Sequence, residues 1–250
     1  MRILIPSCAV GALAIVLALP AYGQTEDPAV HRMFIPVVGH LQGVGGVLWK
    51  TDLSLVNETA SELTVGLTLL AGDQPFFFTT MSAGQQIPLT ELVGEVLATP
   101  GVKGVLEVRS IGSAPVTTQT IVSGWKDGRR ITSQNIPNYP ASIGPVSGVL
   151  RGLRADDEYR TNVGIANASD GVRLVTLAIQ RIDGRSIGIT TLVLAPGELV
   201  HESVLRLFPV LGSGRDLTLV AEPSDDGVVV YATVLDNATN RARFIEPAFR

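Results

Sequence analysis

The sequence predicts an all-β protein built from two similar β-sandwich domains behind an N-terminal signal peptide. Three observations lead to this prediction. One stretch of sequence recurs 110 residues later, apolar and polar residues alternate with a period of two, and turn-forming residues separate the short apolar segments. A period of two is the pattern of half-buried strands, and a repeat at a fixed offset marks duplicated structural units.

The recurring stretch covers residues 49–57 and again residues 159–167. Both copies read aromatic, basic, Thr, then Asp or Asn, followed by aliphatic residues at alternate positions and a final Asn. The first four positions are Trp49, Lys50, Thr51 and Asp52 in one copy and Tyr159, Arg160, Thr161 and Asn162 in the other. Further matches are aliphatic residues at the same offset and, after an insertion of about two residues, turn residues, which a common fold would preserve.

The length of 250 residues suits two domains of ordinary size. We expect a signal peptide at 1–23, a flexible leader at 24–32, a first sandwich at 33–138, a proline-rich linker at 139–147 and a second sandwich at 148–250. The signal peptide is indicated by Met1-Arg2, an apolar run and a small-x-small exit at Ala21-Tyr22-Gly23. An uncleaved anchor is the alternative, and the polar residues 24–27 favour cleavage.

Export has two further consequences. The expected location is secreted, periplasmic or at the cell surface, with no membrane span after signal cleavage. The only cysteine, Cys8, lies in the signal segment, so the mature chain would contain neither a disulfide nor a catalytic thiolate.

Strands are predicted in order along the first copy. Residues 33–38 form a strand that Pro36 restricts to an edge or a bulge. Leu53 and Leu55, a turn at 57–61, and the alternating residues 63–69 predict a hairpin of adjacent strands. In residues 76–81, Phe76 and Phe78 should point to one face and Phe77 to the other.

One short helix is predicted in each sandwich, and the one in the first copy spans residues 90–97 with Thr90 as its N-cap. Asp127-Gly128 predicts a hairpin turn, with Arg129-Arg130 as solvated loop residues. In the second copy, the apolar run 227–235 predicts a central strand. Short strands with almost no helix favour sandwiches that are immunoglobulin-like in architecture only, because the cysteine and tryptophan framework of antibody domains is missing.

The sequence contains no motif that is typical of metal binding or catalysis. His31, His40 and His201 stand in no metal-binding spacing, and no nucleophile-elbow motif occurs, so we expect no cofactor, no metal and no enzymatic activity. Asp156-Asp157-Glu158 is the densest acidic cluster, which reads as a solvated turn, with calcium binding as the alternative. Residues 46–48 of the first copy lack carboxylates, so a duplicated ion site is excluded.

The repeated motif itself reads as structural. A catalytic carboxylate would lose its function as an amide, whereas a residue that accepts a backbone N–H works as Asp52 or as Asn162. The alternative is a ligand site formed by the same motif in both copies. Three triplets, beginning at Asn57, Asn167 and Asn237, have the form of glycosylation sequons, but Asn is also a preferred turn residue.

Charge and composition restrict the partners. The formal net charge is −4, and loss of Arg2 with the signal makes it −5, with no basic cluster for nucleic acid. Hydrophobic residues make up 46% and charged residues 17%, so the surface is apolar enough to pack on a neighbour. We expect a protein or cell-surface partner, with the oligomeric state left open.

Residues 49–69 and 159–179, with Ala195-Pro196-Gly197 and 231–237, resemble repeat units of secreted bacterial proteins of uncharacterised function. Those units are similar to bacterial immunoglobulin-like or adhesion-type sandwich domains. The resemblance implies an exported or periplasmic β-sandwich protein and carries over no catalytic residues.

The preferred hypothesis is therefore a non-enzymatic exported module with a structural, adhesion or protein-interaction role. The alternative is an extracellular or periplasmic binding protein for carbohydrate or another ligand. That protein would use the cleft between the domains or the loops around Trp49 and Tyr159.

Overall fold

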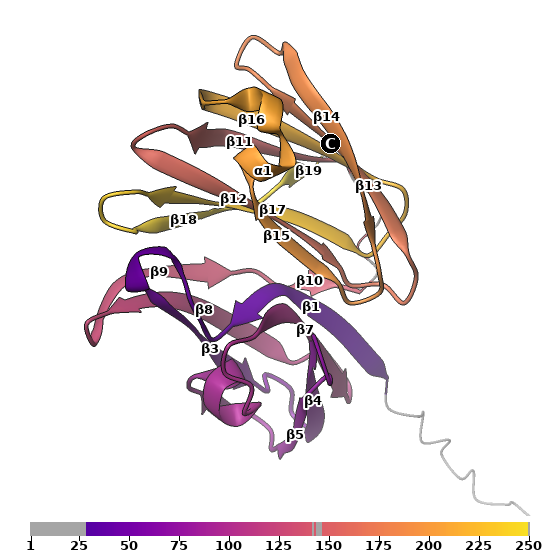
Figure 1. The fold of residues 1–250 in the computed structure, drawn as a ribbon. Coiled ribbons are helices and arrows are strands. Elements are labelled where there is room, and N and C mark those ends of the chain that lie inside the picture. Colours follow the sequence, from indigo (N-terminus) through magenta and orange to yellow (C-terminus); the bar gives the residue numbers. More distant parts are fainter. Residues whose placement is uncertain (1–28, 142, 144–146, 250) are drawn as a thin grey trace, which may run out of the picture.

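The computed structural model describes residues 29–141, 143 and 147–249, and in this part of the chain the fold is all-β, as predicted. The predicted signal peptide, most of the predicted leader and part of the predicted linker lie outside the described residues. The strands form four antiparallel sheets, two in each half of the chain (Figure 1). Among the described helices, none is long and apolar enough to cross a membrane.

The first half contains two sheets. One has the order β10-β1-β7-β4-β5, with strands Tyr139–Pro140, Val30–Gly39, Lys103–Ile111, Leu63–Leu70 and Phe76–Met81. The other has the order β2-β3-β8-β9, with strands Leu41–Gln42, Leu48–Val56, Thr117–Lys126 and Arg129–Ile136, and β6 (Gln86–Leu89) also pairs with β3. Two single-turn helices, η1 (Val44–Gly46) and η2 (Leu92–Val96), complete this half.

The second half has the same arrangement of paired strands, except that β2 has no counterpart there. One sheet runs β14-β13-β16-β11-β19, with strands Ser186–Leu194, Arg173–Gln180, Gly214–Pro223, Gly148–Ala155 and Ala248–Phe249. The other runs β15-β12-β17-β18, with strands Leu199–Ser203, Tyr159–Asn167, Val228–Asp236 and Ala242–Ile245. The helices α1 (Val204–Leu207) and η3 (Pro209–Leu211) follow β15. The exact domain boundaries stay predictions.

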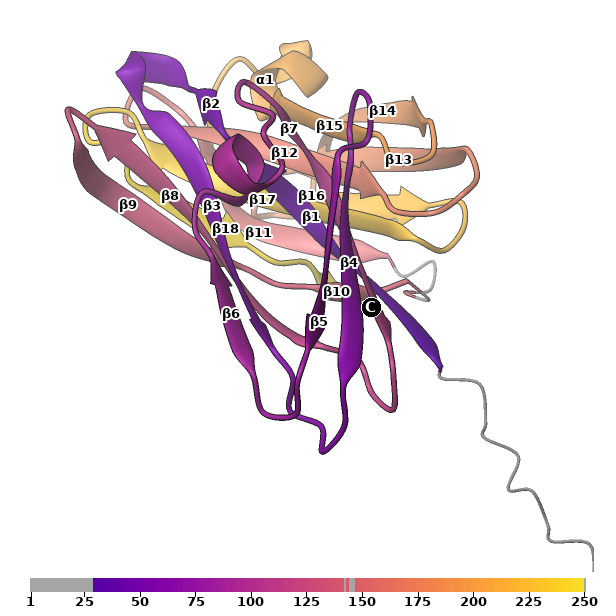
Figure 2. The same cartoon turned by 90° about the horizontal axis from the view of Figure 1, so that it is seen from below.

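The hairpin predicted from residues 53–69 is wrong. Strand β3 pairs with β8 and β6, whereas β4 pairs with β5 and β7 in the other sheet (Figure 2). Leu53 and Leu55 of β3 and alternate residues of β4 lie in one buried cluster, because the two strands line the same core from opposite sheets. Two strands that face each other across a core show the same alternation of buried and exposed residues as two adjacent strands of a hairpin. The period of two therefore could not tell a hairpin from a pair of strands in opposite sheets.

At both ends of the first half, residues predicted to lie in the leader or the linker are part of β-strands. Strand β1 begins at Val30, inside the stretch predicted as a flexible leader, because Val30 pairs with Ile111 of β7. Its register shifts between Ile35 and Val38, which confirms the irregularity expected at Pro36. Tyr139 and Pro140, the first residues of the predicted linker, pair with β1.

The predicted helix exists as the π-helix η2, but Thr90 is not its N-cap. Glu91 precedes the helix in the left-handed conformation, with φ of 49°. Its backbone N–H donates to Oδ1 of Asp52 at 2.8 Å, so a neighbouring strand caps the helix in place of a local side chain.

The aromatic alternation in β5 is confirmed. Phe77 packs against the core of the first half, while Phe76 and Phe78 are 72% and 70% exposed. The hairpin turn at Asp127-Gly128 is also confirmed, because both residues have positive φ and join β8 to β9.

Two buried asparagines hold equivalent corners of the two halves. Asn57 and Asn167 are fully buried, and each Nδ2 donates to three backbone carbonyl oxygens at 2.8 to 3.1 Å. Each Oδ1 accepts from the backbone N–H and the hydroxyl of the residue two positions later, Thr59 or Ser169. The first two sequons are therefore internal structural elements, with no nitrogen available for a glycan in the folded chain.

We predict that Asn57→Ala and Asn167→Ala each lower the free energy of unfolding by about 3 kcal/mol or more, since each leaves several buried carbonyls without a donor. Urea denaturation followed by circular dichroism measures this loss. Asn135→Ala, at an exposed position of β9, is the control and should change stability by less than about 0.5 kcal/mol. Equal, small effects at all three positions would contradict the structural role.

Candidate functional site

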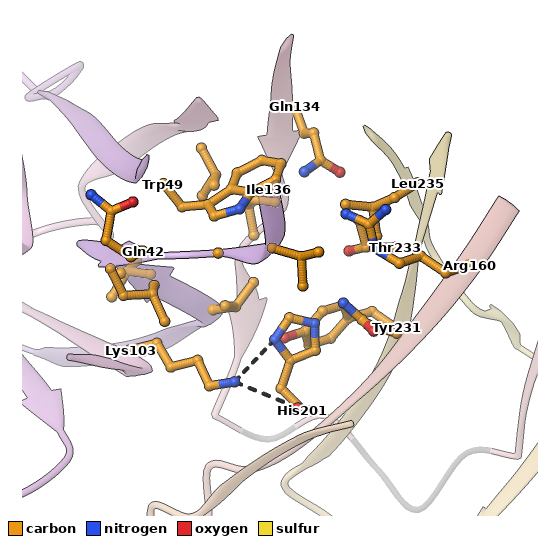
Figure 3. A pocket seen from close by; sticks show the side chains of 18 residues that line it. Gln42, Trp49, Lys103, Gln134, Ile136, Arg160, His201, Tyr231, Thr233 and Leu235 are labelled. Carbon is orange, nitrogen blue, oxygen red and sulfur yellow. Dashed lines mark hydrogen bonds between the residues drawn. The ribbon is translucent and has the colours of Figure 1, made fainter. Parts of the chain in front are cut away.

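A cavity of about 260 Å³ lies between the two halves. Its floor is the outer face of the sheet β15-β12-β17-β18, and the first half covers it (Figure 3). Its apolar lining includes Val37, Leu41, Trp49, Val122, Ile136 and Leu235. Its polar and ionisable lining includes Lys103, Gln134, Arg160, Asn162, His201, Tyr231 and Thr233.

Tyr231 lies in the floor of this cavity. It is fully buried, and its ring crosses Gly164 on the neighbouring strand, where an added Cβ would come within 1.9 Å of Cζ. Phe244 stacks on the ring at 5.0 Å between centroids. The hydroxyl has no hydrogen-bond partner among the described residues. Burial raises the pKa of Tyr231, so the group stays a neutral phenol with a proton to donate.

His201 and Lys103 face each other across the halves. The Lys103 ammonium lies 3.5 Å from Nδ1 of His201 and 3.5 Å from its carbonyl oxygen (Figure 3). Burial, and then the charge of Lys103, lowers the pKa of His201 from 6.5 to about 4, so the imidazole is neutral near pH 7. An ammonium can only donate, so we assign the neutral imidazole the tautomer that leaves Nδ1 unprotonated beside Lys103 and carries the ring proton on Nε2. That buried Nε2 has no acceptor in the described chain.

Two cations reach the cavity without a carboxylate to balance them. Arg160 donates to the side-chain oxygens of Asn237 and Asn240 at 2.9 and 2.8 Å, both of them neutral amides. Burial lowers the pKa of Arg160, and burial also lowers the pKa of Lys103 despite the nearby charge of Glu202. No Asp or Glu is among the described residues that line the cavity.

The residues of the repeated motif, 49–52 and 159–162, do not all lie in the same place in the structure. Trp49, Arg160 and Asn162 line the cavity. Thr51 and Thr161 are buried, and each hydroxyl accepts from one backbone N–H and donates to the carbonyl of the same residue, Gly39 or Arg154. These two threonines have the same structural role.

The remaining positions of the motif differ between the copies. Lys50 pairs with Glu91, whose backbone N–H is held by Asp52. Tyr159 lies outside the cavity lining, with the guanidinium of Arg154 at 3.8 Å from the centre of its ring. The structure thus brings Trp49 and Tyr159 to different places, and a single site that uses both is not formed.

Lys103, Gln134 and Tyr231 carry no signal in the sequence that marks them as site residues, and His201 stands out there only as a histidine outside any metal-binding spacing. The reason is that the site is not duplicated. In the second half Gly164 lies opposite His201 and Tyr231, whereas the equivalent Ser54 lies opposite Pro88 and Gln119. A glycine inside a strand was the one available signal, since such a glycine often makes room for a close neighbour.

Two of the three carboxylates in the acidic cluster, Asp156 and Glu158, pair with Arg154 and Arg215. Asp156 pairs with Arg154 at 2.9 Å and Arg215 at 3.1 Å, and its Oδ1 accepts from the backbone N–H groups of Glu158 and Tyr159. Within the described residues, no group of three or more His, Cys, Asp or Glu side chains is arranged to hold a metal ion.

Comparison with known proteins gives only distant likenesses. No family model matches the chain, and no curated protein matches it. A candidate secreted protein from Parabacteroides distasonis is 11% identical with a TM-score of 0.21, over 76% of this chain and 70% of that one. Bacteroides uniformis β-glucuronidase 2 is 9% identical with a TM-score of 0.17, over 81% of this chain and 26% of the enzyme. A β-glucuronidase from Ruminococcus gnavus is 12% identical with a TM-score of 0.16, over 79% and 34%.

This chain spans only about a quarter to a third of those two glucuronidase chains. TM-scores this low support no functional conclusion, so the function is inferred from the residues of this chain.

The neutral His201 gives a prediction for stability against pH. As the pH falls, the unfolded imidazole takes up its proton near pH 6.5, while the folded one does so only near 4. Between these values the unfolded state binds more protons, so we expect a loss of about 2 kcal/mol between pH 7 and pH 5. Urea denaturation at both pH values measures it. His201→Gln should lack this part of the loss, and an identical pH dependence in both proteins would refute the assignment.

Proposed function

We propose that the protein is a non-enzymatic, exported binding module that takes up a small organic ligand in the cavity between its halves. One observation carries this proposal. The buried side-chain atoms Gln134 Oε1, His201 Nε2 and Tyr231 Oη, all without a hydrogen-bond partner among the described residues, belong to side chains that line the same cavity. Buried polar groups are normally paired, and a cluster of unpaired ones in one cavity indicates a missing partner.

The chemistry of these groups supports binding in preference to catalysis. A general acid or base works best with a pKa near the operating pH. The pKa of His201 is lowered to about 4 and that of Tyr231 is raised, so both hold one protonation state near pH 7. No carboxylate among the described lining residues is placed to relay a proton. The groups can orient a ligand through hydrogen bonds that do not change during binding.

The apolar lining gives the ligand its size and character. Trp49, Val122, Ile136 and Leu235 form an apolar wall around the polar groups. Pockets for drug-sized molecules usually begin near about 300 Å³, so a cavity of about 260 Å³ suits a small molecule of one to three rings.

We predict that the neutral fluorescent probe N-phenyl-1-naphthylamine binds with increased, blue-shifted emission. Val122→Trp should abolish this signal by filling the cavity, while Val122→Ala at the same position should keep it. Val44→Trp, at an exposed position of the lining, is a second blocking variant that leaves the core intact. Equal probe binding by wild type and both tryptophan variants would show that the probe sits elsewhere and would contradict the proposed site.

A second candidate function is association through sheet edges, and β5 and β14 favour it. They occupy equivalent edges in the two halves and expose Phe76, Phe78, Ile189 (68%) and Val193 (64%). Neither strand contains a charged residue or a proline, the usual features that protect an edge from pairing. Because one chain carries two such edges, we propose that copies pair edge to edge.

For this second function, sedimentation velocity should show association that grows with protein concentration. Phe78→Lys with Ile189→Lys should yield monomers, because each places a charge on an edge strand. Val30→Lys replaces an exposed apolar side chain (61%) of β1, which β7 and β4 separate from the β5 edge, and should leave association unchanged. A wild-type monomer at all concentrations, or an equal effect of Val30→Lys, would refute edge pairing.

A further inference from the structure

We infer that the ligand of this cavity is an organic anion, with an apolar ring or chain that carries a carboxylate or a similar acidic group. This inference rests on the proposed binding function and specifies the ligand. It follows from the balance of donors, acceptors and charges among the residues that line the cavity.

Donors outnumber acceptors in the polar lining. Lys103 and Arg160 only donate, His201 presents its Nε2 proton, and the Tyr231 phenol has a proton without an acceptor. Gln134 Oε1 is the one buried side-chain carbonyl of the lining without a partner among the described residues, and its amide can turn to present its NH₂ group instead. The other neutral polar side chains of the lining are amides and a hydroxyl, which can both donate and accept and so leave the excess of donors unchanged. A ligand that satisfies this lining must be rich in acceptors.

The charges of the residues that line the cavity also favour an anionic ligand. Neither Lys103 nor Arg160 has a carboxylate oxygen within ion-pair distance among the described residues. Glu202 is the acid whose charge acts on Lys103, and its own ion pair is with Arg206 at 3.4 Å. Partly buried cations without counter-ions are unfavourable, so an incoming anion gains attraction that a neutral molecule does not.

The geometry leaves room for such an acid. Both contacts of the Lys103 ammonium to His201 are 3.5 Å, which is long for a hydrogen bond, so its protons are free to bind a shorter acceptor. Tyr231 lies close to His201, with 5.9 Å between their ring centres. The Lys103 ammonium, the His201 N–H and the Tyr231 hydroxyl therefore belong to one region of the cavity lining. The apolar wall around Trp49 would hold the body of the ligand.

The test compares 2-naphthoate with 2-naphthamide, a neutral amide on the same ring system, by isothermal titration calorimetry at pH 7. We expect wild type to bind the naphthoate at least about tenfold more tightly, as one charge-assisted hydrogen bond would give. Lys103→Met should remove that preference, and Arg160→Gln should reduce it independently. Lys126→Met, at an exposed end of β8, is the matched control and should keep the preference.

The outcomes separate the inference from the proposed function. Equal affinity for both compounds, or an unchanged preference in both folded variants Lys103→Met and Arg160→Gln, would overturn the anion assignment while leaving ligand binding intact. Failure of both compounds and of the neutral naphthylamine probe to bind wild type would overturn the proposed function itself.

Discussion

Strand β17, in the sheet β15-β12-β17-β18, is buried on both faces of the sheet, and the cavity exists because of this packing. Alternate residues of β17, Val228, Val230, Ala232 and Val234, belong to the core of the second half. The residues between them face the first half, with Val229 in the apolar cluster that joins the halves and Tyr231, Thr233 and Leu235 in the cavity lining. Covering this face removes Tyr231 and His201 from water, which is what shifts their pKa values and leaves their polar atoms unpaired.

The two halves share a scaffold, and the cavity is built where they differ. Asn57 with Asn167 and Thr51 with Thr161 make matching hydrogen bonds to the backbone, so these residues preserve the fold in both copies. The polar lining has no such symmetry, since the place of His201 opposite Gly164 is taken by Pro88 opposite Ser54 in the first half. The two halves are similar sandwiches, and the covered face of the second one carries His201 and Tyr231.

Local patterns in the sequence predicted the all-β class and the alternation of the aromatic residues in β5, because both depend on neighbours close in the chain. They failed where partners come from far away. The predicted hairpin of residues 53–69 is two strands of opposite sheets, and Asp52 caps a helix 39 residues later through the N–H of Glu91. The cavity unites Lys103 with His201, which lie 98 residues apart, and neither the spacing nor the repeat gives any sign of that contact.

The cavity between the halves is expected to admit an acidic organic molecule. A crystal structure of the protein soaked with 4-bromobenzoate would show whether it does, because bromine gives an anomalous signal that locates the ring. We expect a bromine peak beside the apolar wall around Trp49 and Val122, with the carboxylate within hydrogen-bond distance of Lys103 and Tyr231. Bromobenzoate bound only on the outer surface, with water or nothing in the cavity, would contradict it.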